Sequence, residues 1–450
     1  LSTTLCTNAI VNETLEQVGM LIQSGPGMNP SFLNCGEHVV FLDGSIDHRG
    51  HVHKNPSPQL LDKAAEEFTK HGINSIGIVT KFSHRNNRHE QDIHDRLAHH
   101  FSHISMGHRI SGLPNFPRRV YSTWLNAALK SQFTAFQQAI LHGLRQLQID
   151  DCPCYILKAD GGTMPFDVAA TIPCESVHSG PSASVMGCLA LEGNNHDAVL
   201  LDIGGTTTDI AILAEGIPLL EPYGVTVDGR PTLIRALNTR SVGLGGDSSV
   251  ACHNKRFTIG PRKNGPPMAF GGSVPTPTDA MVVLGTLAAG SRSAAEQAMS
   301  LLVPDQDTTV TATRLLATFA ERIKEEVDQM IMEVFTRPVY TVSALLSRKK
   351  IHPQEIITVG GPAGAMREVI AHAFKLPCNV PEHYEVANAV GAARTRPTLQ
   401  ATLYADTSDQ SLIIPEIGYR EKISPHYDMQ CAEDRLTKVI LTLAGKVGMN

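Results

Sequence analysis

One short segment, residues 202–209, combines side chains that suit the binding of a phosphate group and its metal ion. It reads Asp-Ile-Gly-Gly-Thr-Thr-Thr-Asp and lies between two apolar runs, which indicates two strands joined by a turn. Glycines in the turn would let backbone N–H groups approach an anion without an intervening Cβ. Threonine hydroxyls add donors, and the flanking carboxylates could hold Mg²⁺ through its water shell. A plain hairpin turn requires none of these polar side chains, so we favour a phosphate site that uses Asp202, Gly204, Gly205, Thr206, Thr207 and Asp209.

A second glycine-rich turn, at residues 359–365, follows a strand-like run and opens a helix-like one. Gly360 and Gly361 would allow backbone to pack closely on a ribose or a base, and the start of a helix supplies free N–H groups. An ordinary strand-to-helix turn also favours glycine. With the phosphate segment upstream, we expect these two glycines to hold adenosine.

Two polar residues outside these turns are candidates for catalysis. Asp160 precedes two glycines at the end of a strand-like run, where open α/β sheets place their ligands. His178 directly precedes Ser179 and could reach a substrate, although a hydrogen-bonded loop histidine explains it equally well. The histidines between residues 84 and 108 share no helical face, which favours a solvated helix surface over a metal site.

The elements that must position these residues alternate between strand and helix patterns. This order predicts an α/β fold. A proline-broken link is expected at residues 113–117 and a long Gly- and Pro-rich loop at residues 260–277. The pattern indicates strands at residues 18–22, 75–79, 154–157, 198–201, 210–213 and 355–359, and helices at residues 58–71, 87–101, 123–147, 311–335 and 363–374.

Length and composition narrow the function classes. A chain of 450 residues is too long for one core and suggests two or three domains. A net charge of -6 disfavours a nucleic-acid binder. No apolar run has the roughly 18 residues that a membrane helix needs, so we expect no membrane partner and, by default, a cytoplasmic location. Nine scattered cysteines suit reduced thiols better than disulfides.

Several segments, taken in order, resemble one protein family. Residues 202–209 resemble the second phosphate motif of the actin/hexokinase/heat-shock-protein-70 ATPase superfamily. Other segments resemble motifs of its hydantoinase A/5-oxoprolinase branch: residues 2–10 its "TTLATNA" segment, residues 160–162 its "DGG" strand end, residues 179–181 its "SGPAGG" turn, and residues 242–248 its "GxGGGS" loop. In the last of these, Asp247 stands where the pattern has a glycine. Each motif is weak alone, but the ordered set extends to about residue 395.

The resemblance implies two ribonuclease H-like domains of the actin-like ATPase type, with a nucleotide cleft between them. It implies ATP and Mg²⁺ as cofactors, and an ATP-dependent opening of a cyclic amide such as a hydantoin or 5-oxoproline. It also implies a second subunit of a two-component enzyme and an oligomeric state. We expect domains at residues 1–118, 119–396 and 397–450, the last unassigned. The site residues would be Asp202 and Asp209 at the metal, Gly245 and Gly246 at the nucleotide, and Asp209, Asp160 and His178 in catalysis.

The superfamily uses two phosphate loops, and no match to the first is found near residue 1. That loop is expected to lie upstream, to lie on another polypeptide, or to have been lost. The missing loop favours a further alternative, a degenerate scaffold without enzymatic activity. Two other function classes also stay open. One is a regulatory or assembly ATPase that acts on a partner protein, and the other is the ATP-using subunit of a ketone carboxylase.

Overall fold

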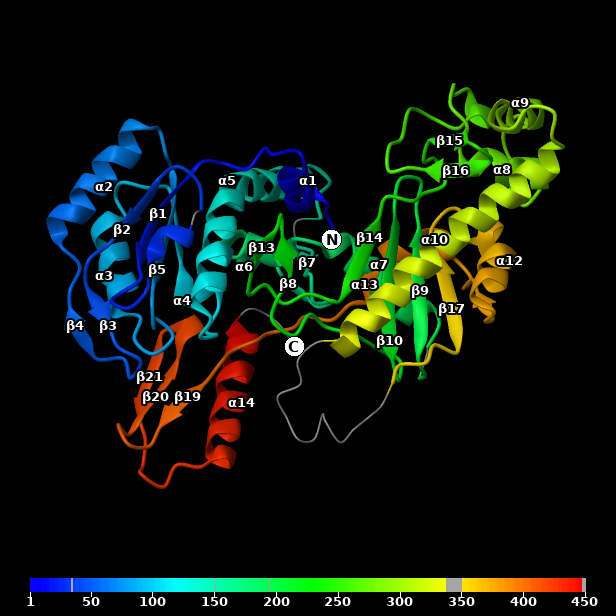
Figure 1. Ribbon diagram of the computed structural model, residues 1–450. Coiled ribbons are helices and arrows are strands. Elements are labelled where there is room, and N and C mark those ends of the chain that lie inside the picture. Colours follow the sequence, from blue (N-terminus) through cyan, green and yellow to red (C-terminus); the bar gives the residue numbers. More distant parts are fainter. Residues whose placement is uncertain (34, 150, 194, 337–349, 447–450) are drawn as a thin grey trace.

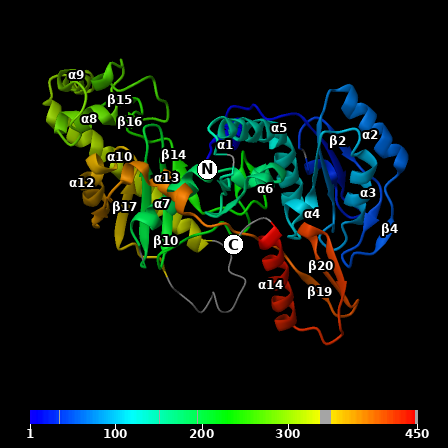
Figure 2. The same cartoon turned by 180° about the vertical axis from the view of Figure 1, so that it is seen from behind.

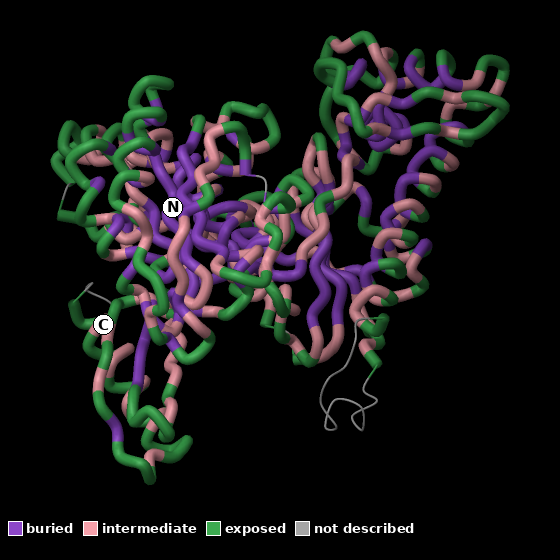
Figure 3. Tube along the Cα trace, turned by 60° about the vertical axis from the view of Figure 1, so that its left-hand side comes forward, coloured by how far each residue is buried: buried purple, intermediate pink, exposed green. Residues whose placement is uncertain are grey.

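The computed structural model describes residues 1–33, 35–149, 151–193, 195–336 and 350–446. Figure 1 shows two lobes, each with its own β-sheet, and the long helix α5 (Phe116–Gln146) that leads from the first lobe toward the second. Buried segments run through the middle of both lobes and exposed segments surround them (Figure 3). The α/β class predicted from the sequence is confirmed.

The first lobe contains a parallel sheet in the order β2-β1-β5-β6. The two central strands are buried along their whole length, which explains their nearly continuous apolar sequence. Two helices cover one face of the sheet, and α5 covers the other. The strands are β1 (Val18–Gln23), β2 (Val39–Phe41), β5 (Ser75–Thr80) and β6 (His103–Met106), and the two covering helices are α2 (Pro58–Lys70) and α3 (Arg88–Leu97).

Helix α5 begins earlier than the sequence pattern predicted. The pattern placed its start near residue 123, after the proline-broken link, but the helix begins at Phe116 with Pro117 in its first turn. Proline is tolerated there because the first N–H groups of a helix have no acceptor within it. Asn115 caps this end by accepting a hydrogen bond from the Arg118 N–H. The prolines therefore start the helix instead of separating two segments.

The second lobe is built on a mixed sheet in the order β11-β10-β9-β17-β18, with β14 also paired to β10. Strands β9 and β10 form an antiparallel hairpin, whereas β17 runs parallel to both β9 and β18. The predicted phosphate segment, residues 202–209, consists of the end of β9, the turn and the start of β10. The strands are β9 (Ala198–Ile203), β10 (Thr208–Ala214), β11 (Ile217–Pro218), β14 (Thr239–Val242), β17 (Glu355–Val359) and β18 (Cys378–Asn379).

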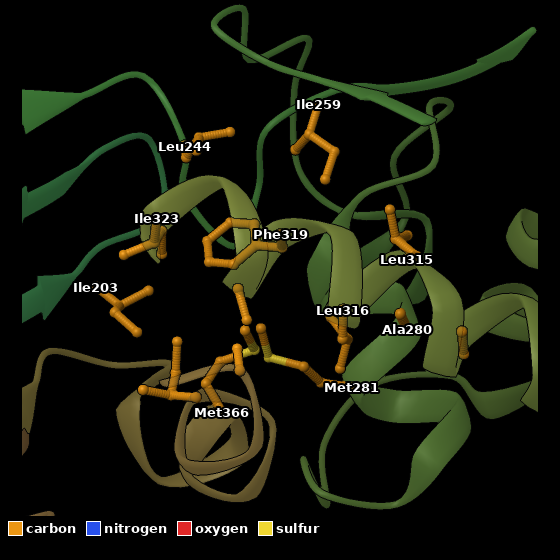
Figure 4. Packing of buried hydrophobic residues seen from close by; sticks show 14 of the residues in the cluster. Ile203, Leu244, Ile259, Ala280, Met281, Leu315, Leu316, Phe319, Ile323 and Met366 are labelled. Carbon is orange, nitrogen blue, oxygen red and sulfur yellow. The ribbon is translucent and has the colours of Figure 1, made fainter. Parts of the chain in front are cut away.

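Side chains along β9 alternate between the two faces of this sheet. Val199, Leu201 and Ile203 pack beneath α10 (Thr308–Thr336) and α12 (Ala363–Phe374), where Figure 4 shows Ile203 close to Phe319, Ile323 and Met366. Ala198 and Leu200 pack beneath α7 (Ser179–Leu191) and α13 (Ala387–Arg394). Because successive side chains in a strand point to opposite faces, Asp202 lies on the α7 face.

Smaller elements complete the two lobes and their junction. The predicted loop is confirmed over residues 260–276 and contains one 3₁₀ turn, Met268–Phe270, and one isolated bridge, Pro267 with Val274; Pro277 begins α8. The other elements are α1 (Leu5–Val11), β3 (Ser45–Ile46), β4 (Val52–Lys54), α4 (Gly107–Ile110), β7 (Tyr155–Leu157), β8 (Thr163–Pro165), α6 (Phe166–Thr171), β12 (Thr226–Val227), β13 (Arg230–Pro231), β15 (Val250–His253), β16 (Arg256–Ile259), α8 (Pro277–Leu284) and α9 (Arg292–Leu302).

The C-terminal stretch, which the sequence left unassigned, returns to the first lobe. It forms an antiparallel sheet of β19 (Tyr404–Asp406), β20 (Ser411–Ile414) and β21 (Tyr419–Lys422), followed by helix α14 (Met429–Lys446). Figure 2 shows these elements beside the first lobe. Gly112 fixes the contact, because its N–H donates to Glu416 and its carbonyl accepts from the Tyr404 hydroxyl.

Among the helices that the structure describes, none has the length and apolar character required to cross a membrane.

The histidines of the first lobe do not all lie on a solvated surface, so that prediction is wrong for three of them. His84, His89 and His108 are buried. The His89 ring bonds the side-chain oxygens of Gln23 and Asn55, and His108 bonds the buried carboxylate of Glu90. Polar partners satisfy both nitrogens of His89 and one of His108, whereas His84 Nδ1 and His108 Nε2 are buried without a hydrogen-bond partner among the described residues. A helical-face count cannot detect such contacts.

Candidate active site

The two aspartates of the predicted phosphate segment face each other across the β9–β10 hairpin. Asp202 and Asp209 are direct partners in the antiparallel register, so both carboxylates lie on the α7 face. Directly opposed like charges destabilise a sheet, and burial adds to the cost. Burial raises the pKa of Asp202, and it raises the pKa of Asp209 to about 6, with the nearby Asp202 as a further cause. A cation between the two carboxylates, or a proton on one of them, would remove this repulsion.

The surroundings of this pair fit a divalent cation. Asp209 Oδ1 is buried without a hydrogen-bond partner, whereas an oxygen of Asp202 accepts a bond from the Ser184 hydroxyl on α7. Mg²⁺ prefers carboxylate, phosphate and water oxygens. Within the described ranges, no cluster of three or more His, Cys, Asp or Glu side chains is placed to hold a metal. Water and phosphate oxygens would therefore supply the ligands beyond Asp202 and Asp209.

Metal binding at this pair should weaken as the pH falls through about 6. Below that pH Asp209 carries a proton, because its folded-state pKa is about 6, and a protonated carboxyl is a poor metal ligand. Titration calorimetry with Mg-ATP near pH 5 and near pH 7.5 should show about tenfold weaker binding at the lower pH. Equal affinities at the two pH values would exclude Asp209 as a ligand.

The turn between the aspartates offers a set of free backbone donors. The Gly204 N–H closes the turn on the Thr207 carbonyl, and the carbonyls of Gly204 and Gly205 accept from Gly246 and Asp247. Among the hydrogen bonds formed by the described residues, none uses the N–H of Gly205, Thr206 or Thr207. Successive free N–H groups in a turn form an anion-binding concavity. The predicted phosphate residues therefore have the donors that their role requires.

A second loop, residues 243–248, lies directly on this turn. The Gly246 N–H donates to the Gly204 carbonyl at 2.9 Å, and the Asp247 N–H donates to the Gly205 carbonyl at 2.7 Å. A Cβ on Gly245 would overlap the Gly205 carbonyl, so only glycine allows the two backbones to approach this closely. The sequence motif predicted that Gly245 and Gly246 belong to the nucleotide site, and the structure brings them to the phosphate turn.

The third turn, at residues 360–362, meets the other two. Gly360 has a φ of 91°, and a Cβ there would overlap Asp202 and the Ile203 carbonyl. A Cβ on Gly246 would lie 3.1 Å from Pro362, so loop 243–248 is packed between the phosphate turn and the start of α12. Gly361 has open space around its Cα. The two halves of the predicted nucleotide site are therefore adjacent.

Asp160 and His178 lie on another side of α7. The Ser182 hydroxyl donates to the carbonyl of Ala159, beside Asp160, whereas Ser184 donates to Asp202. Residues two apart on a helix point in different directions, so α7 separates Asp160 from the aspartate pair. In the described structure, Asp160 bonds Lys158 and the Gly162 N–H, and no hydrogen bond links it to residues 202–209.

His178 precedes α7 with a φ of 62° and donates its N–H to Thr7. Burial lowers the pKa of its imidazole, which favours the neutral ring near pH 7. Ser184 is six residues further along the chain, about 9 Å along the helix axis. The catalytic roles predicted for Asp160 and His178 stay predictions.

Sequence reasoning missed several residues of this site. Ser184 bonds Asp202, Asn388 on α13 donates to Ser184, and Thr278 at the start of α8 donates to Gly246 and Asp247. Lys263, in the Gly- and Pro-rich loop, pairs with Asp247. A single serine or threonine carries no spacing signal, so no sequence pattern indicated these residues.

Most of the chain is similar to known proteins. The protein-family model described as hydantoinase/oxoprolinase matches residues 119–400, and the model of the hydantoinase/oxoprolinase N-terminal region matches residues 1–101. The chain is 27% identical to 5-oxoprolinase of Saccharomyces cerevisiae over 260 residues, which cover 56% of this chain and 20% of that protein. It is 23% identical to caprolactamase subunit alpha of Pseudomonas jessenii over 321 residues, which cover 64% of this chain and 46% of that one. The chain thus spans less than half the length of either relative.

A solved structure shares the fold. The ATP-dependent caprolactamase from Pseudomonas jessenii aligns with a TM-score of 0.74 at 18% identity, over 99% of this chain and 67% of that one. At this identity the likeness shows the fold alone. The predicted α/β fold is confirmed.

Proposed function

The chain belongs to the hydantoinase/oxoprolinase family, and from that premise we propose that it binds Mg-ATP and uses it to activate the carbonyl of a small cyclic amide. The observation that carries this proposal is the opposed pair Asp202 and Asp209, whose unpartnered oxygen lies beside a turn with free N–H groups. The relatives named as a 5-oxoprolinase and a caprolactamase support the class of substrate. Which cyclic amide is the substrate is a question for the substrate panel below.

In this proposal each loop has one task. Asp202 and Asp209 would hold Mg²⁺, which would neutralise charge on the phosphate chain. The N–H groups of Gly205, Thr206 and Thr207 would bind phosphate oxygens, because a turn of free donors suits an anion. The turn at Gly360 and Gly361 would hold adenosine.

The proposed chemistry overcomes the poor reactivity of a cyclic amide. Its carbonyl oxygen would attack the γ-phosphorus, a new O–P bond would form, and the bond to ADP would break. Water would then add to the carbon and the C–N bond would break, which gives a free amine and an acyl phosphate. A second water would hydrolyse the acyl phosphate to a carboxylate and inorganic phosphate, which completes the amino acid. The chain contributes mainly positioning and charge neutralisation. Asp160 and His178 would act on the substrate side of α7, where His178 in its neutral form could accept a proton from water.

A second polypeptide would complete the enzyme. One relative is named as a subunit alpha, and this chain spans only part of that relative. We therefore propose that ring opening, unlike ATP binding, needs a partner subunit. A regulatory ATPase or a ketone carboxylase subunit would use the same nucleotide loops, so the substrate that stimulates ATP consumption decides between them.

The test is ADP formation by the chain with Mg-ATP and a panel of compounds, with and without added partner subunit. We expect a hydantoin, 5-oxoproline or a lactam such as caprolactam to raise ADP formation above the rate without substrate. A ketone that does so while the cyclic amides do not would replace this proposal by the carboxylase reading. Stimulation by a partner protein alone would favour the regulatory ATPase.

A further inference from the structure

Lys263, which lies outside the predicted motifs, is close to the turn at residues 204–207. Lys263 Nζ is 2.7 Å from Asp247 Oδ2, and a Cβ placed on Gly205 would lie 3.7 Å from that nitrogen. The Asp247 carboxylate is also close, because the same Cβ would lie 2.8 Å from its Oδ2. An ion pair therefore lies against the residue whose N–H group begins the row of free donors.

The two members of this pair are held very differently. The Asp247 N–H donates to the Gly205 carbonyl, and its Oδ1 accepts a hydrogen bond from Thr278 at the start of α8. Its side chain is 22% exposed. Lys263 is 39% exposed, lies in the loop between β16 and α8, and has Asp247 as its ion-pair partner among the described residues. Asp247 is thus fixed to the turn, and Lys263 can move its ammonium group along a flexible stem.

A fixed carboxylate at this place opposes the binding of a phosphate. Asp247 stands where the motif has a glycine, and like charges a few ångströms apart repel by about 1 kcal/mol or more even in water. The Lys263 ammonium removes that repulsion and has three donors, so it can bond the carboxylate and a phosphate oxygen together. The Asp247 carboxylate at the position of the motif glycine is then compensated by the cation of Lys263.

We propose that Lys263 is a phosphate-binding residue for ATP and that Asp247 is the positioning residue that holds it over Gly205. This rests on the proposed function, since it assumes that residues 204–207 bind the phosphates of ATP. The rival explanation is a structural pair that only ties the loop at residues 260–277 to residues 243–248.

Titration calorimetry with Mg-ATP separates the two explanations. Lys263→Met should weaken binding roughly tenfold to a hundredfold, because a charge-assisted hydrogen bond to phosphate is lost. Lys263→Arg should stay within a few-fold of the wild type. Adding Asp247→Asn to Lys263→Met should recover part of the loss, because the unpaired carboxylate is removed. Lys422→Met, an exposed lysine on β21, controls for the change in net charge.

The outcomes distinguish this inference from the proposed function. A wild-type chain that does not bind Mg-ATP would overturn both. If the wild type binds, Asp209→Ala abolishes binding and Lys263→Met binds like Lys422→Met, then the Lys263 inference alone is wrong. A lower Tm of Lys263→Met with unchanged affinity would assign the pair a structural role and overturn the inference as well.

Discussion

Asp209→Asn should abolish Mg²⁺-dependent binding of ATP and, at the same time, stabilise the nucleotide-free protein. The substitution keeps the shape and removes the charge of a carboxylate whose Oδ1 is buried without a partner. Loss of a charged metal ligand should weaken Mg-ATP binding by roughly a hundredfold or more, as titration calorimetry would measure.

The stabilising effect follows from the raised pKa of Asp209, about 6 in the folded chain against 3.8 ordinarily. The folded state binds this proton more tightly than the unfolded state, so stability falls as the pH rises between these values and stays lower above about 6. Asp209→Asn should therefore raise the free energy of unfolding, measured with urea, by on the order of 2 kcal/mol over the wild type near pH 7.5. The increase should be much smaller near pH 4.

A matched control for this variant is Asp434→Asn, an exposed aspartate on α14. It should leave both ATP affinity and stability within about 0.5 kcal/mol of the wild type. If Asp209→Asn binds Mg-ATP as tightly as this control does, the aspartate pair is not the metal site. If it lowers stability near pH 7.5, the hydrogen bond that Asp209 accepts from Ser241 outweighs the cost of burying the charge.

Gly391→Ala should strongly destabilise the second lobe. Helices α7 and α13 meet backbone to backbone, and a Cβ on Gly391 would overlap the Ala183 carbonyl oxygen and lie 2.5 Å from the Gly187 nitrogen. Replacing glycine by alanine in a helix normally raises the free energy of unfolding by up to about 1 kcal/mol. Here the overlap should instead lower the free energy of unfolding, measured with urea, by about 2–3 kcal/mol. ATP affinity should fall too, because α7 carries Ser184 to Asp202.

Gly143→Ala in α5 is the matched control for this packing argument. Both glycines are helical, but a Cβ on Gly143 would meet no atom within 4 Å. Gly143→Ala should be neutral or gain up to about 1 kcal/mol in stability. Similar losses in both variants would show that backbone propensity, and not the contact between α7 and α13, governs the effect.

Much of the fold followed from the sequence because its strands and helices carry strong patterns. The central strands β5 and β9 and the amphipathic helix α10 appear at or within a few residues of their predicted positions. Residues 116–122 of α5, about two turns, were missed because a proline at a helix start looks like a break. The return of residues 404–422 to the first lobe depends on contacts such as Glu416 with Gly112, which no local pattern encodes.

The candidate site was predicted where backbone geometry requires particular residues. Gly245 and Gly360 occupy places that a Cβ would fill, so their types are fixed by the approach of two loops. Ser184, Thr278 and Lys263 were not predicted, because single side chains on distant elements meet at the site only after folding. The opposition of Asp202 to Asp209 follows from the register of β9 and β10, whereas the sequence pattern predicted two strands and a turn without their register.

The most direct test of the central claim is a crystal structure of the chain with Mg²⁺ and a non-hydrolysable ATP analogue. Oxygens of Asp202 and Asp209 should lie about 2.1 Å from the metal, or bond its water ligands. The phosphates should accept hydrogen bonds from the N–H groups at residues 205–207, with the adenosine beside Gly360. A nucleotide bound elsewhere, or one at this turn whose metal touches neither aspartate nor their waters, would contradict the account.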